Sequence, residues 1–139
     1  MQAVTNIKNL IPQKDPFIMV DTLRSYSKSA AISSLTIQKD NIFFENSTLN
    51  EAGLVENMAQ TVALHTGYEY FLKGMDAPTG YIGAIKNVEI LKLPLLNETI
   101  STEVRIIQEF MGVTLVEITV FSERNEKIAS CQMKTVISS

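Results

Sequence analysis

The 139-residue sequence has too few cysteines and histidines for an internal disulfide or a structural zinc site. Cys131 is the only cysteine, and a lone thiol is typical of the reducing environment of the cytoplasm. Together with His65, the only histidine, it offers two of the four ligands that structural zinc usually takes. We therefore expect a cytoplasmic protein that holds no metal and uses no cofactor.

Clustered positive charge and long apolar runs are also missing. The net charge is −3 at pH 7, and no run of lysines and arginines marks a nucleic-acid or membrane-surface contact. The N-terminal residues lack the apolar run of a signal peptide, and no stretch approaches the roughly 18 apolar residues that a membrane span needs. These absences predict a protein with neither a nucleic-acid partner nor a membrane span.

What is present is the composition of a folded domain. The hydrophobic share is 45% and the charged share is 19%, which argues against extensive disorder. A chain of this length can bury a core without disulfides or metals. Because it contains no linker, repeat or low-complexity segment, we expect residues 1–139 to form a single domain.

Residues 50–73 form the only long segment with a helical period. Its apolar side chains recur at spacings of three, four and seven, which predicts one buried side. That side carries Leu54, Val55, Met58, Ala59, Val62, Ala63 and Thr66. Asn50 is a good N-cap, and Gly74 is a helix stop. Glu56 and Gln60 share the other side, and a carboxyl group on so apolar a helix is a candidate for proton transfer because burial raises its pKa.

The rest of the chain reads mainly as strands. Strands are predicted over 17–26, 30–38, 81–91, 99–109, 113–122 and 127–137. Residues 1–11 predict a short amphipathic helical turn, and residues 39–49 a loop whose Phe43 and Phe44 cover an apolar surface or line a pocket. The order predicts an α+β fold in which six antiparallel strands, the last four as a meander, wrap round one helix. Its open edges predict a dimer.

Two segments resemble 3-hydroxyacyl-(acyl carrier protein) dehydratases of the hotdog fold. Residues 10–21, LIPQKDPFIMVD, resemble the family's N-terminal signature L-P-H-R-x-P-F-L-L-V-D. Residues 54–60, LVENMAQ, resemble its helix motif L-I-x-E-x-M-A-Q. The two motifs occur in the family's order. The resemblance implies a hotdog fold, an antiparallel sheet wrapped round a long central helix.

The resemblance also implies an active site shared between two subunits. In that family a histidine of the first motif takes the α proton of a 3-hydroxyacyl thioester, and the helix glutamate protonates the departing hydroxyl. Glu56 matches this acid, Gln60 matches the amide that follows it, and Gln13 stands in place of the histidine. Glutamine has no titratable proton and cannot act as a general base.

Further positions match segments that bind substrate in the family. A proline–glycine pair before the family's helix offers a backbone amide to the thioester carbonyl, and Gly53 is the nearest glycine here. Tyr81 and Gly83 lie in a segment that resembles the strand after the helix, where small residues let an acyl chain pass. His65 lies nine residues after Glu56, on the opposite side of the helix, so we expect it to pack in the core and not to replace the base.

Three functions remain open at this point. The first is a dehydratase-like subunit of a fatty-acid-like or polyene pathway, impaired alone or completed by a paralogue. The second is an acyl thioesterase that uses Glu56 with a nearby glutamine, and the third is a non-catalytic acyl-binding or scaffold subunit. The expected partners are an acyl carrier protein or coenzyme A thioester and a second subunit. That subunit would form a homodimer or a heterodimer with a paralogue, with a hexamer as the larger alternative.

Overall fold

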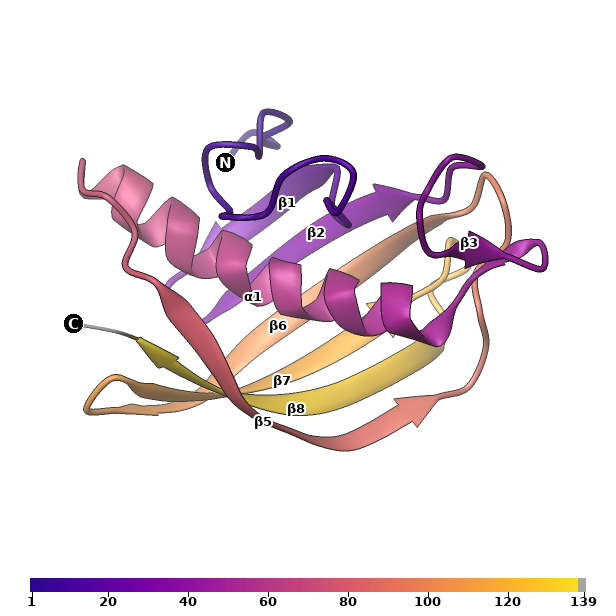
Figure 1. Ribbon diagram of the computed structural model, residues 1–139. Helices are drawn as coiled ribbons and strands as arrows, with labels where there is room; N and C mark the ends of the chain where they lie inside the picture. Colours follow the sequence, from indigo (N-terminus) through magenta and orange to yellow (C-terminus); the bar gives the residue numbers. More distant parts are fainter. Residues whose placement is uncertain (138–139) are drawn as a thin grey trace.

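A computed structural model describes residues 1–137. One antiparallel sheet of six strands curves round a single long helix, α1 (Glu51–Leu72), as Figure 1 shows. The six strands are β1 (Thr22–Ser27), β2 (Ala30–Thr36), β5 (Gly80–Ile90), β6 (Thr99–Phe110), β7 (Val113–Phe121) and β8 (Lys127–Ile137). A small hairpin, β3 (Phe44–Glu45) and β4 (Thr48–Leu49), precedes the helix. The predicted α+β fold is confirmed.

The order of strands in the sheet corrects one prediction. The order is β1-β2-β6-β7-β8-β5, so β5 pairs with β8 and not with β6. Only the last three strands form a meander. The reason is visible in Figure 1, where α1 runs across the concave face of the sheet and the chain returns as β5 along the edge opposite β1. Strands β6 to β8 then fill the space between the two edges.

Both ends of α1 lie where the sequence predicts them. The Asn50 side-chain oxygen accepts a hydrogen bond from the Gly53 N–H at 2.9 Å and caps the first turn. The helix ends at Leu72, with Lys73 as its C-cap. The buried side of the helix differs from the predicted one, because it includes the polar residues Asn57 and Thr61. Both side chains are fully buried, and they form hydrogen bonds to the N-terminal segment and to the sheet, respectively. Several of the predicted apolar positions are only half-buried, namely Val55, Ala59, Val62, Ala63 and Thr66.

The N-terminal segment, predicted as a short amphipathic helical turn, contains a single hydrogen-bonded turn, in which the Leu10 N–H donates to the Ile7 carbonyl at 2.9 Å, and forms no helix. Val4 forms an isolated antiparallel bridge with Leu23, and the helix-like period arises because Ile7, Leu10 and Ile11 pack into a second apolar cluster against α1. The first strand also begins later than predicted, at Thr22. Before Thr22, backbone groups of Phe17 and Met19 form hydrogen bonds with side chains of α1, whereas the backbone groups of a strand would pair with those of a neighbouring strand.

The main core lies between α1 and the concave face of the sheet. It contains Leu54 and Met58 of the helix, together with inward-facing residues of β6, β7 and β8. Among residues 1–137, no helix combines the length and the apolar character that crossing a membrane requires.

Candidate active site

Gln60 holds the carboxylate of Glu56 in one orientation. Its Nε2 donates to Glu56 Oε2 at 2.7 Å and to the Phe17 carbonyl at 2.8 Å, and its Oε1 accepts from the Met19 N–H at 2.7 Å. Gln60 is fully buried, so these contacts occupy both of its donors and its oxygen. We conclude that Gln60 positions Glu56 and the 17–19 backbone, and that its amide is not free to orient a water molecule.

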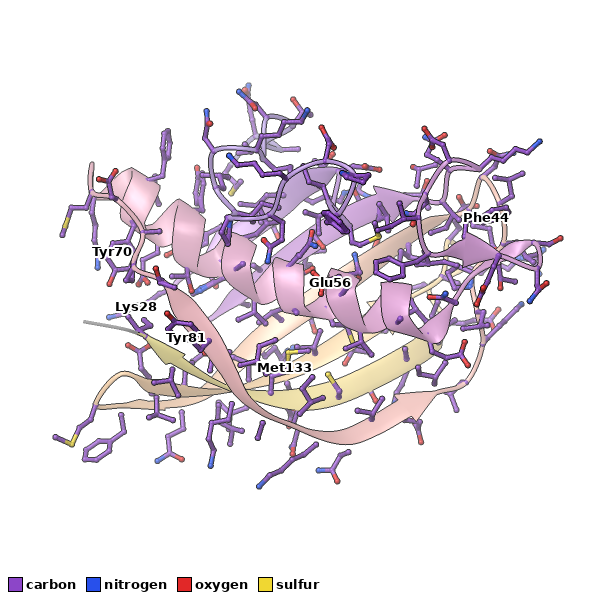
Figure 2. The ribbon with its side chains drawn as sticks, in the orientation of Figure 1. Lys28, Phe44, Glu56, Tyr70, Tyr81 and Met133 are labelled. Atoms are coloured by element: carbon purple, nitrogen blue, oxygen red, sulfur yellow. The ribbon has the colours of Figure 1, made fainter. Side chains whose placement is uncertain are left out.

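This contact decides which oxygen of Glu56 can act. Glu56 is half-buried in the second turn of α1, nearer to Phe44 than to Tyr70 in Figure 2. Because Oε2 already accepts a short hydrogen bond, a proton carried by this side chain belongs on Oε1. The two oxygens of Glu56 therefore differ, and Oε2 is the one that Gln60 engages.

Asn57 is a positioning residue that the sequence reasoning missed. It is fully buried, its Nδ2 donates to the Met19 carbonyl at 2.8 Å, and its Oδ1 accepts from Thr102 Oγ1 at 2.6 Å. Together with Gln60, it bonds both the N–H and the carbonyl of Met19. The available signal was two amide side chains three residues apart on a mostly apolar helix, which places them on the same face.

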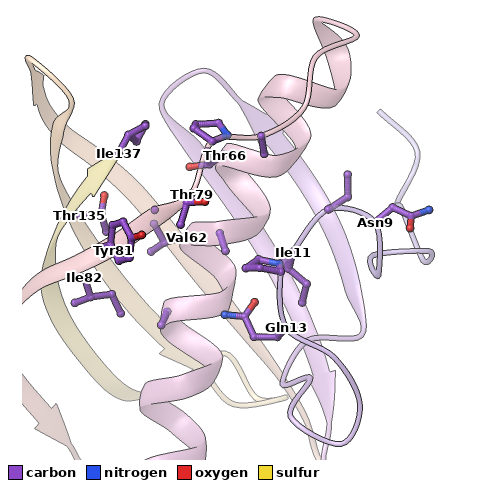
Figure 3. A pocket seen from close by; sticks show the side chains of 17 residues that line it. Asn9, Ile11, Gln13, Val62, Thr66, Thr79, Tyr81, Ile82, Thr135 and Ile137 are labelled. Atoms are coloured by element: carbon purple, nitrogen blue, oxygen red, sulfur yellow. The ribbon is translucent and has the colours of Figure 1, made fainter. Parts of the chain in front are cut away.

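Gln13 lies elsewhere, in the wall of a cavity of about 580 Å³. The cavity is bounded by the N-terminal segment, the second half of α1 and the ends of β5 and β8 (Figure 3). Its lining residues are Asn9, Leu10, Ile11, Pro12, Gln13, Ala59, Val62, Ala63, Thr66, Ala77, Pro78, Thr79, Gly80, Tyr81, Ile82, Thr135 and Ile137. None of these side chains is charged. Glu56 is not among them, so within one chain Glu56 and Gln13 do not line the same cavity.

The remaining candidates fall into two places. Tyr81 lines the cavity, whereas Gly83 lies at a bulge of the exposed strand β5. Phe43, Phe44 and Gly53 lie together at the start of α1, where the two aromatic side chains pack against the main core. A Cβ added at Gly53 would lie 2.8 Å from Phe43 Cβ, and the N–H of Gly53 is already donated to the cap residue. Packing thus accounts for this glycine, and its contact with substrate stays a prediction.

His65 is held by backbone, as expected of a packing residue. It is buried, its Nε2 lies 2.9 Å from the Ser27 carbonyl, and its ring lies 5.0 Å from that of Tyr26. Because a carbonyl only accepts, Nε2 must be the donor in this contact. Cys131 is likewise unsuited to chemistry, since burial raises the pKa of its thiol to about 11. Within residues 1–137, no group of three or more potential metal ligands is present.

Replacing Gln60 with methionine tests its positioning role. Methionine has a similar volume, but it leaves the Met19 N–H and the Phe17 carbonyl without their partners. We expect the Gln60→Met variant to lose about 2 to 4 kcal/mol of unfolding free energy, measured by urea denaturation. The exposed Gln38→Met is the control and should unfold at the wild-type urea concentration. Equal stability of the two variants would contradict the role.

Several solved structures have the same fold. The chain superposes on the dehydratase heterocomplex ApeI:P from Xenorhabdus doucetiae with a TM-score of 0.87 at 12% identity, covering 96% of this chain and 91% of that one. It matches smu.793 from Streptococcus mutans bound to acetyl CoA with a TM-score of 0.74 at 14% identity, covering 94% and 98%. The E. coli PaaI protein gives 0.67 at 10% identity, covering 82% and 80%. These likenesses identify the hotdog fold.

The family follows from sequence comparison. No curated protein matches the sequence significantly. The model of the ApeP-like family, described as ApeP dehydratase, matches residues 5–138. This match spans nearly the whole chain and includes the segments of Gln13, Glu56 and Gln60. The chain therefore belongs to the ApeP-like dehydratase family of hotdog-fold proteins.

Proposed function

We propose that this chain is the acid-bearing subunit of a 3-hydroxyacyl thioester dehydratase and that a paralogous subunit supplies the base. The observation that carries the proposal is the contrast between two side chains. Glu56 is held by Gln60 with Oε1 free to give a proton, whereas Gln13 occupies the expected position of the base and cannot take one. A site shared between unlike subunits would contain both groups, because this chain supplies the acid and the paralogue supplies the base.

The exposed edge of the sheet supports a partner subunit. Strand β5 pairs with β8 along one edge and, within residues 1–137, with no strand along the other. Its apolar side chains are open to solvent in the single chain, with Tyr81 60%, Ile82 47% and Val88 48% exposed. A long apolar edge strand of this kind favours pairing with another chain. We infer that β5 forms the subunit interface, and that Tyr81 and the nearby cavity lie beside it.

The identity of that partner is suggested by the solved relatives. ApeI:P from Xenorhabdus doucetiae is a dehydratase heterocomplex, and its name gives two different components. An unlike partner agrees with Gln13, because a homodimer of this chain would lack a base in both of its sites. We propose a heterodimer, or a hexamer of three heterodimers, and a cytoplasmic location that is compatible with the free thiol of Cys131.

The reaction needs one proton acceptor and one proton donor. The histidine of the paralogue removes the α proton of the thioester, and the electron pair left behind forms the new double bond. The bond between C3 and the hydroxyl oxygen breaks as Glu56 Oε1 donates its proton, so that water leaves and a trans-2-enoyl thioester remains. The carrier is an acyl carrier protein or coenzyme A in a fatty-acid-like or polyene pathway. The acetyl CoA bound to smu.793 is consistent with a thioester ligand.

Assays of the chain with and without its paralogue test the proposal. We expect no enoyl product from the purified chain alone and turnover when the histidine-bearing paralogue is added. Gln13→His should restore a base to the chain itself and give measurable enoyl product without the paralogue. Equal turnover with and without the paralogue would contradict the shared site. Release of a free 3-hydroxy acid would favour the thioesterase alternative, and no reaction from any combination would favour a scaffold.

A further inference from the structure

The side-chain oxygen of Gln13 has no hydrogen-bond partner. Gln13 Oε1 is buried, and no donor among residues 1–137 reaches it. Buried polar atoms in folded proteins are nearly always paired, because an unpaired one loses its hydrogen bonds to water without replacement. It is the one buried side-chain nitrogen or oxygen without a partner in the described part of the chain. Gln60, the other glutamine of the candidate site, has every polar atom satisfied.

The surroundings indicate where the missing donor comes from. Gln13 lines the cavity from the N-terminal segment on one side of α1 in Figure 3, and Val62 and Tyr81 lie toward the other side. At about 580 Å³, the cavity lies within the size range of small-molecule sites. The terminal torsion of a glutamine is broad, so its carbonyl can turn toward a donor that enters the cavity.

The lining also narrows the chemistry of the ligand. Most of the lining side chains are apolar and none is charged, which suits an alkyl or alkenyl chain without a formal charge. A neutral ligand supplies a hydrogen to Gln13 through a hydroxyl or an amide N–H. Within the ligand class of the proposed function, the donor near the reacting carbons is the 3-hydroxyl group.

We propose that the cavity at Gln13 is a second acyl site, which binds a 3-hydroxyacyl thioester through its hydroxyl and does not dehydrate it. The hydroxyl donates to Gln13 Oε1, and the amide oxygen accepts this hydrogen bond but cannot remove the α proton. The ligand therefore remains intact. The class of ligand rests on the proposed function, whereas the unpaired acceptor does not. In the complex, one subunit pair would then contain one reacting site and one holding site.

Three matched ligands test the proposal by calorimetry on the full chain. The first is a 3-hydroxyacyl pantetheine analogue in which an amide replaces the thioester, and the others are its saturated and trans-2-enoyl counterparts. We expect the hydroxyl analogue to bind about tenfold more tightly than the other two, as one added hydrogen bond allows. In Gln13→Met this preference should disappear. The ligand-free variant should also melt roughly 3 to 6 °C higher, because it no longer buries an unpaired oxygen.

Gln38→Leu is the control variant. Gln38 lies outside the cavity, is exposed to solvent, and its amide can bond to water. Its replacement should change neither the ligand preference nor the melting temperature. Equal affinity of the wild-type chain for the three ligands would overturn the proposal, as would a preference that survives in Gln13→Met. An unchanged or lower melting temperature of Gln13→Met would mean that water or another subunit satisfies the oxygen, and would overturn it as well.

The result of the ligand-binding test can be distinguished from the result of the dehydration assay that tests the proposed function. Binding to the holding site requires no turnover and no paralogue, whereas dehydration is measured on the complex. Loss of the ligand preference would leave the dehydration result standing, and absence of dehydration would leave the binding result standing.

Discussion

Replacing Glu56 with glutamine is expected to lower the dehydration rate of the complex by about 10²- to 10⁴-fold, the usual contribution of a general acid or base. Glutamine has the shape of glutamate but no acidic proton, so the departing hydroxyl would leave unprotonated. The fold should survive, because the carbonyl of the new side chain can still accept the hydrogen bond from Gln60 Nε2. The measurement is the rate of trans-2-enoyl product formation at saturating 3-hydroxyacyl substrate.

The matched control is Glu51→Gln. Glu51 lies on the same helix, but it is exposed in the first turn, where its charge interacts favourably with the helix dipole. This variant should keep the wild-type rate. If Glu56→Gln also kept it, another group would have to carry the acid proton, and the proposed role of Glu56 would fail.

Replacing Gly67 with alanine is expected to displace the N-terminal segment. A Cβ built at Gly67 would overlap the Leu10 carbonyl oxygen, a backbone atom that no rotamer change can move away. Alanine normally favours a helix by about 1 kcal/mol over glycine, so the expected sign is the reverse of the usual one. Loss of the packing of Ile7, Leu10 and Ile11 would cost about 3 to 6 kcal/mol of unfolding free energy.

Urea denaturation gives the stability of Gly67→Ala, and limited proteolysis gives the position of the segment. We expect cleavage within residues 1–13 at protease concentrations that leave the wild-type chain intact. Gly80→Ala is the control, because a Cβ at Gly80 meets nothing within 4 Å. A Gly67→Ala variant as stable and as resistant as Gly80→Ala would show that the segment does not depend on close approach to the helix.

The sequence predicted the elements of the fold better than their pairing. Alternating and helical periods placed the later strands and the helix within a few residues of their observed ends, and Asn50 caps as predicted. The place of β5 beside β8 was not predicted, because local periodicity carries no information about which strands are neighbours. In the N-terminal segment the predicted helical turn is limited to residues 7–10, because burial against one side of α1 gives a helix-like spacing of apolar residues without a helix.

The sequence identified the residues of the candidate site but not how they are arranged in space. The family resemblance selected Glu56, Gln60 and Gln13, yet their partners follow from tertiary contacts. The hydrogen bonds of Gln60 join residues separated by 41 and 43 positions in the chain. The oxygen of Gln13 is unpaired because no residue near it in the fold places a hydrogen-bond donor within reach, and a sequence pattern does not show which residues are near.

The contacts of Gln60 connect Glu56 to the N-terminal segment. In a site shared between subunits, Glu56 would serve one pocket, and the segment that carries Gln13 would face the other. The amide of Gln60 forms hydrogen bonds to both Glu56 and the N-terminal segment. A mutation at position 60 that released the segment would therefore also change the position of the Glu56 carboxyl group. The orientation of Glu56 and the backbone position of residues 17–19 therefore depend on a single side chain and cannot be changed independently through it.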